Sequence, residues 1–389
     1  MEEIIDYNEK SLEMHKKNKG KIEIKSKVKL ENKEDLSLAY TPGVAEVSRK
    51  IAEDKNKIYD YTFKGNSVAV ISDGTAVLGL GNIGAEAALP VMEGKAILFK
   101  EFANIDAFPI CLKEQNTEKT IETIKNISPV FGGINLEDFK APECFEIESR
   151  LQDLGIPVMH DDQHGTAVVV LAGLTNALKL RGSEKQDVKI IINGSGAAGI
   201  AVAKLLLKDG FKKITMIDSK GIIHKQRDNL NQIKKQIAEV TNYANINGDL
   251  NHALVGADVF IGVSVANLLN KEMIQSMNNN PIIFALANPV PEVMPDVAQQ
   301  AGAFIIATGR SDFPNQINNV LAFPGIFRGA LDIRAKRITD KMKLAAAKAL
   351  ANLIKPEINK ILPNPLDKSV VPAIAEAVKK AYLEEEEGV

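Results

Sequence analysis

VKIIINGSGAAGIAVAKLLLKDGFKKITMIDS, residues 188–219, decides the fold class of this 389-residue chain. An apolar strand is expected to end at Asn193, a helix to begin near Ala197, and a second strand to end at Asp218. Glycines spaced GxGxxG between strand and helix allow a tight turn and a close approach of the backbone to a pyrophosphate at the helix N-terminus. The pattern predicts dinucleotide binding; the alternative is a glycine-rich turn that only packs a helix on a strand. The candidate cofactor contacts are Gly194, Ser195, Gly196, Ala197, Ala198, Gly199 and, for the adenosine ribose, Asp218.

A second GxGxxG lies at residues 79–84, behind an apolar strand at 68–72. Its context is poorer, because Pro90 interrupts the following segment and the next predicted strand, AILFKEF at 96–102, gives only an ambiguous acidic match. This copy is therefore interpreted as a structural or substrate-side loop.

The composition points to an α/β enzyme. Hydrophobic residues make up 45% of the chain and aromatic residues only 5%, which suits the aliphatic core of a parallel sheet. A net charge of −2 gives no reason to expect nucleic acid or an anionic membrane as partner. The charged N-terminus has no apolar signal core, and the two cysteines form no disulfide framework, so a cytoplasmic protein is expected.

Strands and helices alternate along most of the chain, which predicts parallel sheets. We expect an N-terminal α/β domain at 1–160 and a Rossmann-type domain with a doubly wound parallel sheet at 161–389, ending in helices from about residue 315. Residues 181–187, RGSEKQD, are the best candidate for a linker, and residues 4–19 are expected to form a helix.

Two carboxylate pairs stand out, Glu137-Asp138 and Asp161-Asp162. Apolar runs that are expected to be buried strands, residues 129–131 and 156–159, precede them. Buried carboxylates are costly unless they are neutralised, and a hard divalent cation with oxygen ligands would neutralise them. The alternatives are a helix N-terminus rich in Asp and a solvated loop.

Several motifs together resemble the malic enzyme family in its short prokaryotic form. They are LAYTPGVAEV at 38–47, VAVISDGTAVLGLGNIGAEAALPVMEGKAILFK at 68–100, VFGGINLEDFKAPECFEIE at 130–148, IPVMHDDQHGTA at 156–167, NGSGAAGIA at 193–201, IDSKG at 217–221, FALANPVPE at 284–292 and ATGRSDFPNQINNVLAFPGIFRGALD at 307–332. The resemblance implies oxidative decarboxylation of L-malate to pyruvate and CO₂ with NAD or NADP and with Mg²⁺ or Mn²⁺.

The resemblance also implies roles for individual residues. Glu137, Asp138 and Asp162 would be the metal ligands, and Asp161 would lie behind them or near the nicotinamide. Lys95 would take the proton of the C2 hydroxyl, with a pKa lowered by burial beside a cation, and Tyr40 would protonate enolpyruvate. Asn288 and Asn319 would contact the substrate carboxylate. On the residues alone, Lys95 could be a surface charge, Tyr40 a packing residue and both asparagines turn or capping residues.

Some questions stay open at this stage. Ala76 stands where larger eukaryotic members carry an arginine for the substrate carboxylate, so Thr75, the 79–84 loop or Arg310 must serve instead. Asp218 favours NAD, whereas Lys225 and Arg227 could hold the 2′-phosphate of NADP. The family is usually dimeric or larger, and Tyr40 could cross into a neighbour's site. A malolactic conversion of malate to lactate and a non-catalytic nucleotide-sensing protein are the alternative functions.

Overall fold

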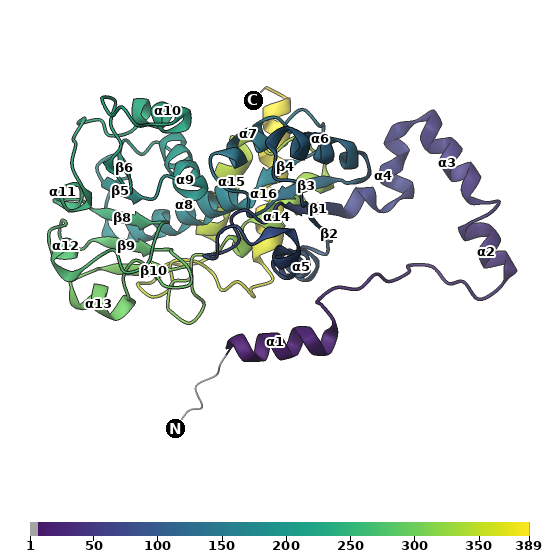
Figure 1. The fold of residues 1–389 in the computed structure, drawn as a ribbon, viewed down its shortest axis with the longest axis horizontal. Coiled ribbons are helices and arrows are strands. Elements are labelled where there is room, and N and C mark those ends of the chain that lie inside the picture. Colours follow the sequence, from purple (N-terminus) through teal and green to yellow (C-terminus); the bar gives the residue numbers. More distant parts are fainter. Residues whose placement is uncertain (1–6, 389) are drawn as a thin grey trace.

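The computed structural model describes residues 7–388, whose strands form two separate sheets (Figure 1). The first sheet contains β1 (Ser67–Ser72), β2 (Asp106–Cys111), β3 (Gly133–Leu136) and β4 (Val158–His160). Its order is β2-β1-β3-β4, and every pair is parallel. The second sheet contains β5 (Lys189–Asn193), β6 (Lys213–Asp218), β7 (Gly221–Ile222), β8 (Val259–Gly262), β9 (Ile282–Ala285) and β10 (Ile305–Thr308). Its order is β10-β9-β8-β5-β6-β7, and only β7 is antiparallel to its neighbour.

Helices cover both faces of the first sheet because successive side chains of a strand point to opposite faces. Val68 and Val70 of β1 belong to one core, with residues of α5 (Gly84–Ala103) and α14 (Phe323–Asp332). Ala69 and Ile71 belong to the opposite core, with residues of α6 (Thr117–Ile127) and α7 (Glu143–Ser149). The sheet is thus the middle layer of three, as the α/β prediction required.

The second sheet is layered in the same way. On one side lie α9 (Ala197–Lys208) and α10 (Gln232–Val240), and on the other lie α11 (Leu250–Leu254), α12 (Lys271–Gln275) and α13 (Pro295–Gln300). In β8, Val259 and Ile261 pack in the first core and Phe260 in the second. The predicted Rossmann-type parallel sheet is confirmed.

Long helices connect the two halves. The buried helix α8 (Asp161–Arg181) packs against α9 of the second half and against α15 (Asp340–Asn352), which in turn packs on α16 (Val370–Glu386). Helix α14 packs on α16 and also on α5 of the first half. The expected helical C-terminus is confirmed, and the proposed linker lies between α8 and β5. The division into domains at residue 160 stays a prediction.

Two expected strands are wrong. Residues 96–102 continue α5, which runs through Pro90 as one helix. Met92, Ala96, Phe99 and Ala103 recur every three or four residues and are the buried side of this helix, so the apolar run has a helical period. Residues 128–130 form a short 3₁₀ helix, and the strand before Glu137 is β3 instead, four residues later than expected.

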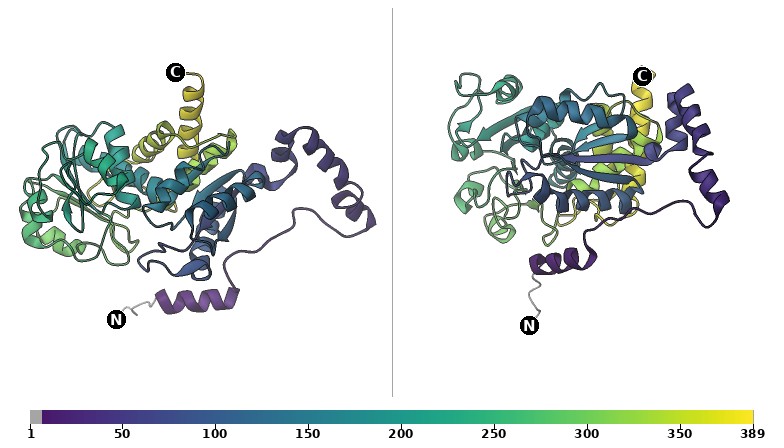
Figure 2. Two further views of the ribbon diagram at one scale, coloured as in Figure 1. Left: turned by 45° about the horizontal axis from the view of Figure 1, so that its top comes forward. Right: turned by 45° about the vertical axis from the view of Figure 1, so that its right-hand side comes forward.

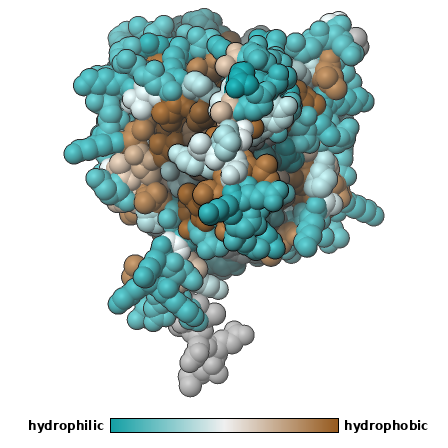
Figure 3. All heavy atoms as spheres, turned by 90° about the vertical axis from the view of Figure 1, so that its right-hand side faces the viewer, coloured by the Kyte–Doolittle hydropathy of each residue, from teal (hydrophilic) through white to brown (hydrophobic). Residues whose placement is uncertain are grey.

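The N-terminal helices form an arm that leaves the body of the molecule. It contains α1 (Tyr7–Asn18), α2 (Lys33–Ala39), α3 (Val44–Glu53) and α4 (Ile58–Tyr61), and Figures 1 and 2 show α2 and α3 far from both sheets. Positions 4–6 of the expected first helix lie outside the described residues; α1 covers the rest except Lys19, which follows it in a turn. Figure 3 looks onto this arm and shows apolar surface among polar surface there. The exposed apolar residues of the arm include Leu36, Leu38, Tyr40, Val44 and Val47.

None of the helices in residues 7–388 has the length and hydrophobicity that crossing a bilayer requires.

Candidate active site

Both carboxylate pairs lie at the carboxyl ends of neighbouring strands of the first sheet. Glu137 and Asp138 follow β3, and Asp161 and Asp162 follow β4 and open α8. Ends of adjacent parallel strands meet at one edge of a sheet, which is where α/β proteins bind ligands. One carboxylate oxygen from each of Glu137, Asp138 and Asp162 can be chosen so that all three lie within 4.8 Å of one another. The predicted metal ligands are therefore neighbours in space.

The protein balances the negative charges of this cluster only in part. Burial, together with the neighbouring carboxylates, raises the pKa of Glu137 to about 8 and that of Asp138 to about 9. Burial would raise the pKa of Asp162 too, but His160, whose Nε2 lies 3.1 Å from Asp162 Oδ2, lowers it. Asp138 Oδ2 is buried and has no hydrogen-bond partner among the described residues. An all-oxygen set of this kind fits a hard divalent cation such as Mg²⁺ or Mn²⁺.

Lys95 reaches the same cluster from α5. Its side chain is only 7% exposed, so the interpretation as a surface charge is wrong. Its Nζ lies 2.8 Å from Glu137 Oε1 and 2.7 Å from Asp161 Oδ2. Burial alone would lower the pKa of Lys95, but the charges of Asp161 and Glu137 raise it above the ordinary value. The pKa of Lys95 is thus raised and not lowered as expected, because two carboxylates stabilise the ammonium group.

Asp161 is fully buried, and it binds Lys95 rather than any residue of the glycine-rich turn. A Cβ atom at Gly165 would lie 1.8 Å from Asp161 Oδ1, so the glycine one turn along α8 makes room for this carboxylate. Its assignment as a cofactor contact stays a prediction.

A pocket of about 890 Å³ is lined by every predicted metal, substrate and catalytic residue except Tyr40, and by one of the predicted cofactor contacts. The first half contributes Lys95, Glu137, Asp138 and Asp162, and the second half contributes Ala198, Asn288 and Asn319. The loop at 78–79 lines the same pocket, and a Cβ atom at Gly79 would lie 2.7 Å from the carbonyl oxygen of Asn288. The first glycine motif therefore packs beside the candidate substrate residues, as expected of a substrate-side loop.

The second glycine motif forms the turn between β5 and α9. Gly194 has a φ of 116°, which a residue with a side chain rarely adopts. A Cβ atom at Gly199 would lie 1.8 Å from the carbonyl oxygen of Gly194, whereas one at Gly196 would meet nothing within 4 Å. The turn thus packs tightly on its protein side and leaves the backbone at Gly196 open to a ligand.

Asp218 ends β6, as predicted, and its Oδ2 lies 2.6 Å from Arg227 Nη2 and 2.5 Å from Lys234 Nζ. Lys225 pairs with Glu239 instead. Sequence reasoning missed Lys234, which lies 16 positions from Asp218 on a helix of no recognised motif.

Of the predicted catalytic, metal-ligating and substrate-binding residues, Tyr40 alone does not line the pocket. It follows α2 on the arm, is 67% exposed, and is not among the residues that line the pocket. Among the described residues of the arm, those that line the pocket are Ser11, Met14, His15 and Lys21.

Two of the three groups that could replace the arginine of larger members as a contact for the substrate carboxylate are engaged elsewhere. The hydroxyl of Thr75 donates a hydrogen bond to Asp73 and accepts one from the backbone amide of Lys140. The guanidinium of Arg310 pairs with Asp312. The 79–84 loop is the remaining candidate, since Gly79 lines the pocket.

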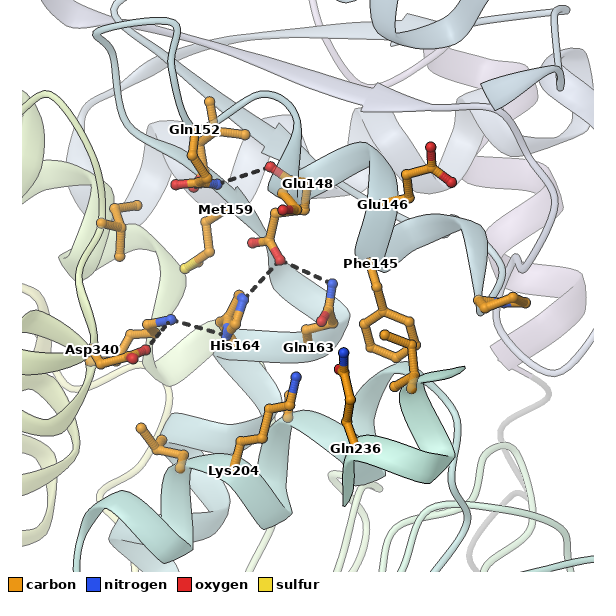
Figure 4. Close-up of a pocket in the computed structure, with 18 of the residues that line it drawn as sticks. Phe145, Glu146, Glu148, Gln152, Met159, Gln163, His164, Lys204, Gln236 and Asp340 are labelled. Atoms are coloured by element: carbon orange, nitrogen blue, oxygen red, sulfur yellow. Dashed lines mark hydrogen bonds and ion pairs between the residues drawn. The ribbon is translucent and has the colours of Figure 1, made fainter. Parts of the chain in front are cut away.

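The backbone amide of His160 and the ring of His164 both form hydrogen bonds with Glu148, a buried carboxylate that sequence reasoning did not single out. Figure 4 shows Glu148 beside Gln163 and His164, in a second cavity.

Comparison with known proteins agrees with the geometry. The family model "Malic enzyme, N-terminal domain" matches residues 19–152, and "Malic enzyme, NAD binding domain" matches residues 163–382. A bifunctional malic/malolactic enzyme of Bacillus subtilis is 59% identical over 97% of this chain and 93% of its own length. An NAD-dependent malic enzyme of Geobacillus stearothermophilus is 55% identical over 93% and 76% of the two chains. The crystal structure of an NAD-dependent malic enzyme of Thermotoga maritima has a TM-score of 0.93 and 54% identity, covering 95% of this chain and 98% of that one.

Proposed function

Because the chain belongs to the malic enzyme family, we propose that it oxidatively decarboxylates L-malate to pyruvate and CO₂, with NAD⁺ or NADP⁺ as the hydride acceptor. One observation carries most of the proposal: a single pocket is lined by a buried lysine, three carboxylates, two asparagines and Ala198 of the glycine-rich turn. Family membership makes the protein an NAD(P)-dependent oxidoreductase, so the non-catalytic nucleotide sensor is set aside.

Glu137, Asp138 and Asp162 are proposed to hold Mg²⁺ or Mn²⁺. Their oxygens lie close enough together to share one ion, and the raised pKa values of Glu137 and Asp138 reflect buried negative charge that Lys95 offsets only in part. When bound, the cation would supply positive charge that polarises the ketone of the oxidised substrate and stabilises the enolate left by CO₂.

Lys95 is proposed to accept the proton of the malate C2 hydroxyl. Only the neutral amine can do so, and two carboxylates within 2.8 Å keep the group protonated. Engagement of Glu137 as a metal ligand would withdraw one of those charges and lower the Lys95 pKa toward the range in which it can act as a base. Asp161 would remain as the fixed partner that orients the amine.

Asn288 and Asn319 are proposed to donate hydrogen bonds to the substrate carboxylate, since both line the pocket and amide side chains carry two donors. The turn at 194–199 is proposed to hold the pyrophosphate of the cofactor at the N-terminus of α9.

Tyr40 is proposed to reach the pocket of a second copy of the chain in a homodimer or larger homo-oligomer. Its own pocket lacks it, and the arm that carries it exposes a series of apolar side chains. Exposed apolar patches of this kind mark interaction sites. In the partner's pocket the phenol would protonate C3 of enolpyruvate.

A second candidate, the malolactic reaction, is favoured by the name of the Bacillus subtilis relative. Malate with Mn²⁺ and either NAD⁺ or NADP⁺ separates the two reactions, when reduced nicotinamide is followed by absorbance and the products by chromatography. The main proposal expects pyruvate and reduced cofactor in equal amounts, and no turnover when Mn²⁺ is removed. Accumulation of lactate without net reduced cofactor would establish the malolactic reaction instead.

A further inference from the structure

Glu148 is a buried carboxylate near the end of α7 that fastens the first turn of α8. It is 9% exposed. Its Oε1 accepts a hydrogen bond from the backbone amide of His160 at 2.9 Å. Its Oε2 lies 3.1 Å from Nε2 of Gln163 and 2.9 Å from Nε2 of His164 (Figure 4). All three partners flank Asp161 and Asp162, and the backbone before α8 has no side-chain cap of its own. Glu148 therefore holds the helix start from outside the helix.

The contact continues from Glu148 to a candidate metal ligand. His160, whose backbone Glu148 binds, is fully buried, and its ring Nε2 lies 3.1 Å from Asp162 Oδ2. The same oxygen of Asp162 accepts a hydrogen bond from the backbone amide of Asp138 at 2.8 Å. A shift of His160 would thus move the carboxylate that meets Asp138, and with it the spacing of the ligand oxygens.

His164, which binds Glu148, makes a further contact on its other ring nitrogen. Nδ1 of His164 lies 3.3 Å from Nζ of Lys343, which pairs with Asp340 at 2.8 Å (Figure 4). If Lys343 donates to Nδ1, then Nε2 of His164 carries the proton that it donates to Glu148. Burial would raise the pKa of Glu148, but His164 and His160 lower it to about 2, so the carboxylate stays charged.

Glu148 cannot touch the reacting atoms. It lines a separate cavity of about 1010 Å³, and no residue that lines this cavity also lines the candidate active-site pocket. Asp162 faces the pocket, whereas Gln163 and His164, the next residues of α8, face the cavity. Any effect of Glu148 on the reaction must pass through α8 and His160.

We propose that Glu148 is a positioning residue for the metal ligand Asp162, acting through His160 and the first turn of α8. The inference rests on the proposed metal site at Glu137, Asp138 and Asp162. Groups that orient metal ligands in this way typically change metal affinity by roughly 10- to 100-fold when they are lost.

The test measures Mn²⁺ binding directly, by electron paramagnetic resonance of free Mn²⁺, without malate or nucleotide. Glu148→Gln keeps the size of the side chain but removes its charge and places an NH₂ group against the donors of one of its two oxygens, so Mn²⁺ should bind roughly 10- to 100-fold more weakly. Glu148→Asp keeps the charge and should recover part of the loss. Glu146→Gln is the matched control, since Glu146 lies on the same helix, is exposed and pairs with Arg150. It should bind Mn²⁺ like the wild type.

A second measurement, the dissociation constant of NAD⁺ or NADP⁺ for each folded variant, detects general damage. It should stay within roughly twofold of the wild type, because the hydrogen-bond partners of Glu148 are His160, Gln163 and His164 and none of them belongs to the turn at 194–199. Unchanged Mn²⁺ affinity in Glu148→Gln, or equal losses of Mn²⁺ and cofactor affinity, would overturn the positioning role. If Glu148→Gln does not fold, an undiminished Mn²⁺ affinity in Glu148→Asp overturns it.

Asp162→Ala distinguishes a wrong role for Glu148 from a wrong assignment of the metal site itself. If the wild type binds no Mn²⁺, or if Asp162→Ala binds it equally well, the proposed metal site is wrong. If Asp162→Ala abolishes binding and Glu148→Gln does not weaken it, only the role of Glu148 is wrong.

Discussion

Asp218 and Arg227 form a partly buried ion pair at the end of β6, with 2.6 Å between Oδ2 and Nη2. Lys234 meets the same oxygen at 2.5 Å, so one carboxylate holds two cations. The end of this strand is where a Rossmann domain meets the adenosine ribose, with a carboxylate for the 2′-hydroxyl of NAD or cations for the 2′-phosphate of NADP. The chain has both kinds of group at this position, and the carboxylate currently engages the cations.

Asp218→Ser should therefore shift the preference toward NADP⁺. The substitution removes the acceptor for the ribose hydroxyls and frees Arg227 and Lys234 for a phosphate. Charge-assisted hydrogen bonds contribute about 1.5–3 kcal/mol, so the ratio of kcat/KM for NADP⁺ over NAD⁺ should rise roughly 10- to 100-fold in initial-rate measurements. Adding Arg227→Gln should reverse much of the rise, and Lys225→Gln should not, since Lys225 pairs with Glu239. An unchanged ratio would mean that this strand end does not select the cofactor.

Asp218 also makes folding depend on pH at the acid end. Burial would raise its pKa, but hydrogen bonds from Arg227 and Lys234 lower it to about 2, below the value of about 4 for an unfolded Asp. A lowered pKa stabilises the fold above pH of about 4, and this contribution is lost as the pH falls from about 4 toward about 2. Asp218→Asn should therefore unfold at lower urea concentration at pH 7, and the gap to the wild type should narrow at pH 3. Asp228→Asn, at an exposed site nearby, should show no such gap.

The sequence was sufficient for most of the strands and for the cluster of carboxylates. Apolar runs bounded by glycines or acids mark β5, β6, β8 and β9, and paired carboxylates after two strands require a counter-charge wherever they lie. The error at residues 96–102 has a simple cause. A short, fully buried apolar run looks alike in a strand and a helix, and only the spacing of Met92, Ala96, Phe99 and Ala103 reveals the helix.

Contacts between distant segments could not be predicted in this way. Glu148 meets His160 and His164, and Lys234 meets Asp218, because helices bring them together, and no spacing rule covers such pairs. The pKa of Lys95 was expected to be lowered, whereas it is raised, because its direction depends on which carboxylates lie beside the amine. Burial alone would have given the opposite sign.

Alanine substitutions at two glycines of the turn should impair the protein in different ways. A Cβ atom at Gly199 would lie 1.8 Å from the carbonyl oxygen of Gly194, so Gly199→Ala must push α9 away from β5. It should lower the melting temperature by several degrees, as overpacking typically costs about 1–3 kcal/mol. Gly196→Ala meets nothing within 4 Å and should melt like the wild type, yet bind NAD⁺ or NADP⁺ at least roughly tenfold more weakly because its methyl group occupies the approach to the pyrophosphate. Equal melting temperatures and equal cofactor affinities in both variants would contradict the assignment of this turn.

Mixed oligomers should reveal which chain supplies Tyr40. Lys95→Ala should lose malate oxidation, and Tyr40→Phe should lose pyruvate formation more than oxaloacetate reduction, because the phenol is needed only after CO₂ leaves.

If Tyr40 acts in the partner's pocket, a dimer of one Lys95→Ala chain and one Tyr40→Phe chain contains one complete site, with the lysine of the second chain and the tyrosine of the first. Unfolding and refolding the two inactive proteins together in equal amounts would then restore about one quarter of wild-type pyruvate formation, since half of the dimers are mixed and each has one working site of two. If Tyr40 acts in its own chain, each site of the mixed dimer lacks one of the two groups and no activity returns. A refolded mixture of wild-type and Lys95→Ala chains controls for the yield of refolding. If this control is active and the mixture of Lys95→Ala and Tyr40→Phe chains is not, Tyr40 does not act in the partner's pocket.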